Sequence, residues 1–378
     1  MPSQGTPTVC LTMTNLFFLF NDLTRPYELQ NAIPLAEELH KQLFRVSFGV
    51  LSNRDTGLVK RLLHAGIPVH LLPVRHVLDM SGAWRLRQVI QETRPQIIHA
   101  WGPMATRLAR LAISSTPEGN DPRLVVTGAS SPGSGFGGWV TTRMLRRADR
   151  VIARTWAEAA RYRQLKVSTE HLTRIVPTPA PLQAGFDRNA LLGQLGLPPS
   201  AQVIVTIGLS EEGVGPRDAI VTFDMLRYEF PDLHLLVVSD SSESQTLEQF
   251  ARGLAYDDYR VHIISDHTIW NEVIQAADLV LITRPRDGIE DALTAMASRK
   301  AVISWNSPDL VEIIDDGNTG YVVPVGDRAT LASKTRQLLC DPALAEYFAR
   351  NGHERVTRWY NLPRWIKQHL YIYSELTQ

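Results

Sequence analysis

The sequence is poor in cysteine and has no long apolar segment. Its 378 residues include only Cys10 and Cys340, too few for a disulfide framework and typical of a reducing compartment. The apolar run at residues 16–20 is too short for a signal peptide core or a membrane span, and no basic segment precedes it. We therefore expect a cytoplasmic protein, with peripheral attachment to the inner face of a membrane left open.

Several catalytic motifs are also missing. No Gly-x-x-x-x-Gly-Lys-Ser/Thr segment is present, which excludes a P-loop, and the lack of a Gly-x-Ser-x-Gly elbow disfavours α/β-hydrolase chemistry. The histidines and cysteines lack zinc-ligand spacing, so we expect no metal. The basic segments lack the interleaved aromatic residues of nucleic-acid grooves, so we expect no nucleic-acid partner.

The net charge is zero, but the two halves differ in sign. Residues 1–180 hold 22 Lys/Arg against 12 Asp/Glu, whereas residues 181–378 hold 17 against 27. Either the two halves attract each other, or the basic half faces an anionic acceptor or membrane surface. The same two alternatives apply to a local basic run, which is either a solvated face or a contact for acidic acceptors or lipids: Arg143, Arg146, Arg147, Arg150 and Arg154.

The length and the apolar pattern predict two α/β domains of similar size. Short apolar runs alternate with helical patterns in both halves, which indicates parallel sheets covered on both faces. Five prolines in residues 177–200 mark a linker, and residues 363–376 form an amphipathic helix that needs a partner surface. We expect strands at residues 9–13, 46–50, 69–72, 97–100, 124–127, 151–153, 203–207, 233–238, 279–282 and 301–304.

Residues 277–327 contain two consecutive strand-to-helix turns. Such turns present helix N-termini, which bind anions, at one edge of a parallel sheet. Asp287 and Glu290 have the spacing of a capping box, so both carboxylates either begin the helix or contact a ligand. Arg284 and Arg286 precede this helix and suit a diphosphate, the alternative being a solvated loop.

This segment resembles the nucleotide-sugar-binding segment of retaining family 4 glycosyltransferases. Asp287-Gly288 occupies the place of the family's Glu-Gly pair, and Thr294 that of its second Glu, before Ala295-Met-Ala297. Glu312-Ile-Ile matches another family Glu. The closing turn matches through Gly317, Gly320, Pro324, Gly326 and Asp327, and shorter similarities occur at residues 145–152, 230–235 and 276–279.

The resemblance implies the GT-B fold, with two Rossmann-like doubly wound parallel-sheet domains facing a cleft. Residues 1–180 would form the acceptor domain, 181–360 the nucleotide-sugar donor domain, and 361–378 a helix packing back on the first domain. The implied activity is transfer of a hexose-type sugar from a nucleotide-diphosphate sugar, with retention and without a cofactor. The acceptor, whether a glycan, a lipid or a small molecule, is not readable.

The resemblance also implies roles for individual residues. Catalytic positions would be Asp287, Glu290 and His99, although the residues themselves favour a structural histidine at His99. Donor-binding positions would be Gly208, Arg217, Arg284, Arg286, Gly288, Ile289, Thr294 and Glu312. Acceptor-side positions would be Asn15, Ser130, Gly133 and Gly135; the last two belong to a Gly133-x-Gly135-x-x-Gly138 pattern, which we interpret as a flexible loop rather than a dinucleotide site.

An alternative function is suggested by the family residues that this chain lacks. Thr294 replaces the ribose-binding Glu, Leu209 replaces an Arg after Gly208, and Asn306-Ser307 replaces a Gly-Gly pair. A degenerate GT-B protein that binds a glycan or nucleotide without turnover would tolerate these changes. A nicotinamide enzyme that uses the Gly133 loop is the third hypothesis.

Overall fold

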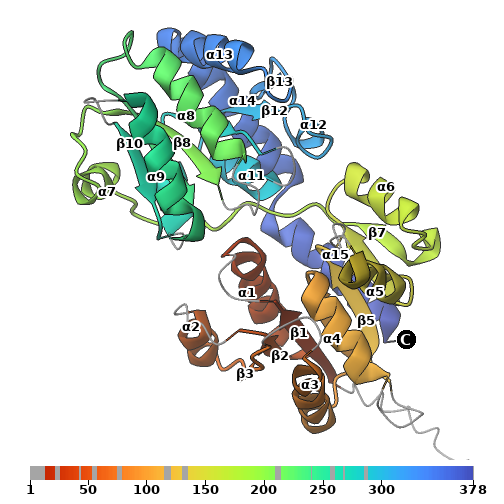
Figure 1. Ribbon diagram of the computed structural model, residues 1–378. Helices are drawn as coiled ribbons and strands as arrows, with labels where there is room; N and C mark the ends of the chain where they lie inside the picture. The colour runs from red at the N-terminus through yellow and green to blue at the C-terminus, as the bar shows by residue number, and fades with distance from the viewer. Residues whose placement is uncertain are drawn as a thin grey trace, which may run out of the picture. The chain divides into compact units, whose positions relative to one another are not determined.

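The structure is a computed structural model of the chain. It describes residues 13–21, 26–41, 44–52, 58–74, 79–114, 121–129, 135–208, 214–239, 241–255, 260–266, 269–284 and 288–377. Its backbone contacts divide the chain into two compact units (Figure 1). Unit 1 comprises Met1–Arg154, Ala159–Ile175 and Ile366–Gln378, and unit 2 comprises Thr155–Glu158 and Val176–Trp365.

Unit 1 is built on a parallel sheet of seven strands in the order β3-β2-β1-β4-β5-β6-β7. Its strands are β1 (Thr14–Phe20), β2 (Phe44–Val50), β3 (Val69–Leu71), β4 (Ile97–Trp101), β5 (Arg123–Thr127), β6 (Arg150–Ala153) and β7 (Leu172–Arg174). Its helical segments are α1 (Pro26–His40), α2 (Leu58–His64), α3 (Met80–Thr93), α4 (Pro103–Ile113), α5 (Gly135–Leu145), most of α6 (Trp156–Gln164), the short 3-10 turn Thr169–His171 and most of α15 (Leu362–Leu376).

The first strand that the structure describes is one that the sequence did not predict. A strand at residues 9–13 was expected, but β1 is Thr14–Phe20, and of residues 9–13 the structure describes only Met13, outside any strand. The apolar run of residues 16–20 therefore belongs to β1, an interior strand of the unit 1 sheet. Its side chains alternate between the two faces of the sheet, so both faces bury apolar groups, as parallel sheets require.

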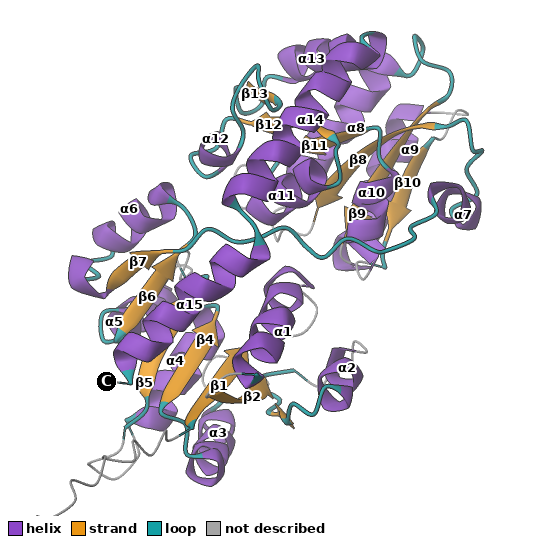
Figure 2. Ribbon diagram, turned by 180° about the vertical axis from the view of Figure 1, so that it is seen from behind, coloured by secondary structure: helices purple, strands orange, loops and turns teal. Residues whose placement is uncertain are grey.

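Each face of this sheet is covered by its own helices. Phe17 and Leu19 pack with residues of α3, α4, α5 and α6 in one hydrophobic cluster. Phe18 lies on the opposite face and packs against Tyr373 of α15, with ring centroids 6.4 Å apart. Figure 2 shows the part of α15 assigned to unit 1 in front of the unit 1 sheet.

Unit 2 is built on a parallel sheet of six strands in the order β10-β9-β8-β11-β12-β13. The parallel-sheet α/β prediction is therefore confirmed in both halves. The strands are β8 (Gln202–Gly208), β9 (Leu233–Ser239), β10 (Val261–Ile264), β11 (Leu279–Ile282), β12 (Ala301–Trp305) and β13 (Tyr321–Val323). The helices are α7 (Arg188–Gln194), α8 (Val214–Leu226), α9 (Ser241–Ala255), α10 (Trp270–Ala276), α11 (Ile289–Ala297), α12 (Leu310–Ile313), α13 (Arg328–Cys340) and α14 (Pro342–Trp359).

The helices of unit 2 also lie on both faces of their sheet. α8, α9 and α13 cover one face, whereas α10 and α11 cover the other, as the two opposite views show (Figures 1 and 2). The core between α8 and the sheet contains Phe223, which is 1% exposed, and the side chains of β9 and β11. No helix in the described part of the chain is both long and apolar enough to cross a membrane.

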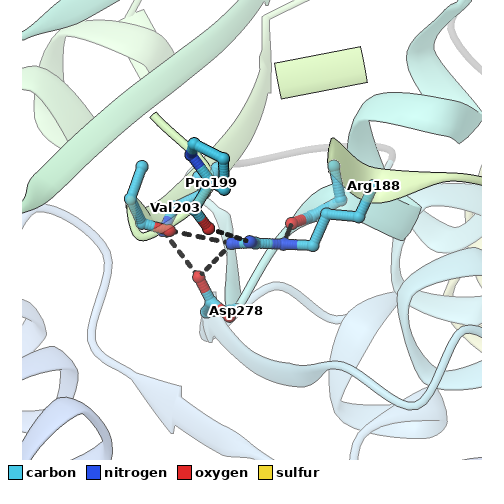
Figure 3. Close-up of polar contacts among 6 residues, drawn as sticks. Arg188, Pro199, Val203 and Asp278 are labelled. Carbon is cyan, nitrogen blue, oxygen red and sulfur yellow. Dashed lines mark hydrogen bonds and ion pairs between the residues drawn. The ribbon is translucent and has the colours of Figure 1, made fainter. Parts of the chain in front are cut away.

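The predicted linker is partly helical and is held firmly by unit 2. Asp187 accepts hydrogen bonds from two backbone N–H groups and so caps α7. Arg188, the first residue of α7, donates to Asp278 Oδ2 at 2.9 Å and to the carbonyl oxygens of Ala276, Pro199 and Ala201 (Figure 3). One guanidinium therefore joins α7 to the amino ends of β8 and β11.

Candidate functional site

The strand order of unit 2 reverses between β8 and β11. These strands are hydrogen-bonded neighbours, and the chain leaves them toward opposite faces of the sheet, α8 following β8 and α11 following β11. In open α/β sheets, ligands bind outside the carboxyl ends of the strands at such a switch point. Gly208 ends β8 and Thr283 follows β11, so Gly208, Arg284 and Gly288 of the predicted donor residues lie at this edge.

Two glycines allow the backbone to pack closely there. A Cβ atom on Gly208 would lie 2.3 Å from Cγ of Pro216, and one on Gly215 would lie 2.8 Å from the carbonyl oxygen of Thr283. The first turn of α8 therefore rests against the end of β11, and the Thr283 hydroxyl donates to the Gly215 carbonyl at 2.6 Å. The amino end of α8 is fixed beside the turn that begins α11.

Arg284 is buried at this turn and forms an ion pair. Its guanidinium donates to Asp291, in the first turn of α11, and the two residues are 6% and 1% exposed. Gly288 is the N-cap of α11, in a left-handed conformation with φ of 90°. A Cβ atom on Gly288 would lie 3.7 Å from Nη2 of Arg284, so the guanidinium lies close to this glycine. Arg284 thus braces the β11–α11 turn, and its charge is balanced by Asp291.

Other donor-side residues differ in exposure. Arg217 is exposed, with its guanidinium carbon 5.4 Å from the ring centroid of Phe250. Glu290, in the first turn of α11, is half-buried, whereas Ile289 is 1% exposed and belongs to the core. Arg217 and Glu290 therefore retain surface through which a ligand could be contacted.

Thr294 and Glu312 make contacts within unit 2. Thr294 is fully buried, and its hydroxyl accepts a hydrogen bond of 3.0 Å from the backbone N–H of Ala180. The half-buried Glu312 accepts one of 2.7 Å from the N–H of Trp156, in the short segment assigned to unit 2. The helix that carries Glu312, α12, starts at Leu310, whose N–H donates to the Ser307 hydroxyl at 3.2 Å.

Unit 1 has its own switch point between β1 and β4. Asn21 follows β1, and its Oδ1 accepts a 2.7 Å hydrogen bond from the N–H of Ala105 at the beginning of α4. Gly102 has φ of 92°, and a Cβ there would lie 2.4 Å from Nδ2 of Asn21. Asn15, predicted on the acceptor side, lies instead at the opposite edge. Because β1 begins at Thr14, Asn15 is at its amino end, and its side-chain amide donates to the carbonyl of Thr93 at 3.1 Å.

His99 lies inside β4 and is fully buried. Its Nδ1 is 2.7 Å from the Tyr373 hydroxyl and its Nε2 is 2.8 Å from the Thr127 hydroxyl, both within unit 1. Burial, together with His369 nearby, lowers the pKa of His99 well below its usual value, so the ring is neutral. Burial also raises the pKa of Tyr373 well above its usual value. This is the geometry of the structural histidine that the sequence left as an alternative.

Most of the remaining predicted positions lie outside the described residues. Ser130, Gly133, Arg286 and Asp287 lie outside the described residues, and Gly135 is the first residue of α5. Among the residues that the structure describes, no group of three His, Cys, Asp or Glu side chains could hold a metal ion.

Sequence reasoning missed Asp291, Gly215 and Asn21. Asp291 follows Arg284 by seven residues, and only the fold shows that their side chains meet. Asn21 directly follows a strand, which is a usable signal for a capping side chain once the strand is placed correctly. Gly215 stands in a glycine-containing segment from which its close contact with Thr283 could not be read.

Two family models match the chain, one in each half. Residues 201–341 match the model described as glycosyl transferases group 1, and residues 34–178 match the glycosyl transferase 4-like domain. Together with the fold, these matches support a glycosyltransferase of the family 4 type.

Individual proteins give a consistent result. N-acetyl-alpha-D-glucosaminyl L-malate synthase of Bacillus anthracis is 26% identical over 191 residues, which cover 50% of each chain. D-inositol 3-phosphate glycosyltransferase of Segniliparus rotundus is 24% identical over 229 residues, covering 57% of this chain and 50% of the relative. The chain thus spans about half the length of these curated relatives.

Solved structures match over nearly the whole chain. HepE of Anabaena, in complex with UDP-glucose, has a TM-score of 0.80 at 18% identity and covers 96% of this chain and 99% of its own. Sucrose-phosphate synthase of Thermosynechococcus elongatus has a TM-score of 0.77 at 18% identity, with 96% and 99% covered. The predicted GT-B fold is confirmed. The family-model matches do not favour the non-catalytic alternative.

Proposed function

We propose that this chain transfers a hexose-type sugar from a nucleotide-diphosphate sugar to an acceptor, with retention of configuration. The observation that carries the proposal is the carboxyl edge of unit 2. There the amino ends of α8 and α11 meet at the β8/β11 switch point, packed through Gly208 and Gly215. Helix amino ends favour anions, and the solved complexes of HepE contain UDP and UDP-glucose.

Different groups in unit 2 bind the diphosphate and the sugar of the donor. The backbone N–H groups that begin α8 and α11 face the diphosphate, and Arg217, in the first turn of α8, adds an exposed positive charge. Arg284 acts through Asp291 by holding the β11–α11 turn. Glu290 accepts hydrogen bonds from sugar hydroxyls, because a carboxylate suits a hydroxyl donor and repels a diphosphate. Asp287, outside the described residues, is proposed to share that role, and Thr294 and Glu312 to shape the site from within unit 2.

The proposed chemistry needs little from the protein beyond charge and position. The bond between the anomeric carbon and the diphosphate oxygen breaks, and the diphosphate leaves with the electron pair. The acceptor hydroxyl forms the new bond on the same face, and its proton passes to the departing diphosphate. Donors aimed at the leaving group stabilise this step, so no metal and no general base is assigned.

A direct test combines nucleotide binding with turnover. UDP, GDP and ADP are titrated calorimetrically, and the sugar donors of the base that binds are then assayed for product with simple glycosides and for slow hydrolysis. Glu290→Gln is expected to lower kcat at least tenfold and to change nucleotide affinity little, because the carboxylate contacts the sugar. Glu354→Gln, an exposed position on α14, is the matched control and keeps full activity.

The outcomes separate the alternatives. A selective nucleotide with turnover that falls only in Glu290→Gln supports the proposal. Binding without release of sugar from any donor would favour the non-catalytic function, and reduction of bound NAD would favour the nicotinamide enzyme.

A further inference from the structure

The outer surface around α5 combines an exposed indole with a cluster of cations. Trp139 is 61% exposed, and the guanidinium carbon of Arg143, one turn further along α5, lies 6.0 Å from its ring centroid. Arg146 and Arg147 follow in the turn after α5, and both are exposed. We call these four residues the α5 basic face. In Figure 1, α5 lies at the surface of unit 1 beside α4.

The positive charge of this face is not neutralised locally. Residues 135–166 contain eight Arg/Lys and two acidic residues. Of the two, Asp149 pairs with Arg123 and accepts from the N–H of Leu124, and Glu158 is buried. Among the described residues, no ion pair joins Arg143, Arg146 or Arg147 to a carboxylate.

Neighbouring residues extend the face and show where it ends. Arg146 donates to the carbonyl of Leu165 at 2.7 Å, which places it beside the end of α6, where Arg163 and Lys166 are exposed. Arg150, by contrast, pairs with Glu375 at 2.7 Å and stabilises unit 1. Three arginines of the basic run seen in the sequence, Arg143, Arg146 and Arg147, therefore belong to this surface, whereas Arg150 is structural. With Arg163 and Lys166 the surface has five exposed cations beside one indole.

We infer that the α5 basic face docks unit 1 on an anionic phospholipid surface. Arginine and lysine attract anionic headgroups, and tryptophan prefers the boundary between headgroups and acyl chains. The occupant follows from charge complementarity and from the indole, because a purely ionic contact with a soluble acidic partner would not favour an exposed tryptophan.

Vesicle co-sedimentation of the full chain tests this docking without any need for turnover. Wild-type protein is mixed with vesicles of phosphatidylcholine containing about 30% phosphatidylglycerol, or of phosphatidylcholine alone, in 0.1 M and 0.5 M NaCl. We expect binding to the anionic vesicles only, and its loss at the higher salt. Each arginine near the surface changes partitioning by about fivefold, so Arg143→Ala/Arg146→Ala/Arg147→Ala weakens binding roughly 100-fold.

Matched variants locate the effect. Arg252→Ala/Arg336→Ala/Arg350→Ala removes the same charge from exposed positions of unit 2 and should leave binding nearly unchanged. Trp139→Ala should weaken binding, whereas Trp84→Ala, at a position 60% exposed on α3, should not. Circular dichroism and thermal melting confirm that each variant is folded.

Three results would overturn the inference. These are an absence of wild-type binding to anionic vesicles, equal losses in the two triple variants, and binding to an acidic polypeptide or a DNA duplex without binding to vesicles. The last would assign the α5 basic face to another macromolecule. Calorimetric nucleotide binding is measured on the same samples, so a failure of docking is distinguishable from a failure of the proposed transferase.

Discussion

Replacing Asp291 with asparagine removes the negative partner of Arg284, a guanidinium that is only 6% exposed. Breaking a buried ion pair from one side typically costs about 3–5 kcal/mol, because the remaining charge is uncompensated. Asparagine keeps an oxygen acceptor of similar shape, so we expect Asp291→Asn to lower the free energy of unfolding by about 3 kcal/mol, the low end of this range. The exposed pair Arg252–Glu248, with side chains 66% and 42% exposed, is the control, and Glu248→Gln should cost less than about 1 kcal/mol.

Hydrogen exchange measured by mass spectrometry isolates the effect within unit 2. A loss of 3 kcal/mol corresponds to roughly 100-fold faster exchange of the most protected amides in β11 and β12. Peptides of unit 1 serve as the internal reference. Equal protection in Asp291→Asn and Glu248→Gln would refute the buried-pair reasoning.

A double variant then separates the stability role of this pair from a role in binding. Arg284→Met/Asp291→Leu replaces the pair with apolar side chains and should recover most of the lost stability. Nucleotide affinity should stay reduced, because the β11–α11 turn loses its polar brace. If the double variant recovered both the stability and the nucleotide affinity of the wild type, Arg284 would have no role in the proposed donor site.

Four further predictions follow from burial and close packing. Burial lowers the pKa of His99 and of His262 below the unfolded value of 6.5, so the unfolded chain binds protons that the folded chain does not. The free energy of unfolding should therefore fall below about pH 6.5 by up to about 1.4 kcal/mol per pH unit for each histidine, as urea titrations from pH 5 to 7.5 would show. Gly320→Ala should destabilise unit 2, because its Cβ would lie 2.5 Å from the Val302 carbonyl oxygen, whereas Gly253→Ala in open space on α9 should stabilise it by about 1 kcal/mol; thermal melting compares them. Thr294→Val should cost about 1–3 kcal/mol by leaving the Ala180 N–H unsatisfied, and calorimetry of the variant with the nucleotide shows whether the hydroxyl also contacts ribose. Tyr373→Phe should cost about 1 kcal/mol in a urea titration through the lost hydrogen bond to His99, and an unchanged stability would contradict that contact.

The sequence predicted the parallel sheets well, because buried strands of such sheets are continuous apolar runs. Residues 279–282 are β11 as predicted, and residues 203–207 lie within β8. The strand β1 was not predicted, because an apolar run of five residues fits a strand only once its pairing is known: Leu16 pairs with Val46 and Ile97. The helix α7 was missed because flanking prolines dominate the composition of that segment.

The candidate site was less readable than the fold. Helix amino ends after β8 and β11 follow from the alternating pattern, so the edge could be predicted. The partners of individual side chains could not, because they depend on segments distant in sequence: Thr294 meets Ala180, and His99 meets Tyr373. The sequence alone therefore does not show whether a polar side chain bonds to another part of the protein or stays available for a ligand.

Unit 1 takes its last helical segment from the very end of the chain, and this has a consequence for synthesis on the ribosome. The sheet face that carries Phe18 receives Tyr373 only after residues 176–365 have been made. At about 5–20 residues per second, that interval lasts roughly 10–40 seconds. During it the nascent first half presents uncovered aromatic side chains, a target for chaperones. Expression of residues 1–175 alone should therefore give aggregates, and a peptide of residues 366–378 supplied in trans should reduce them.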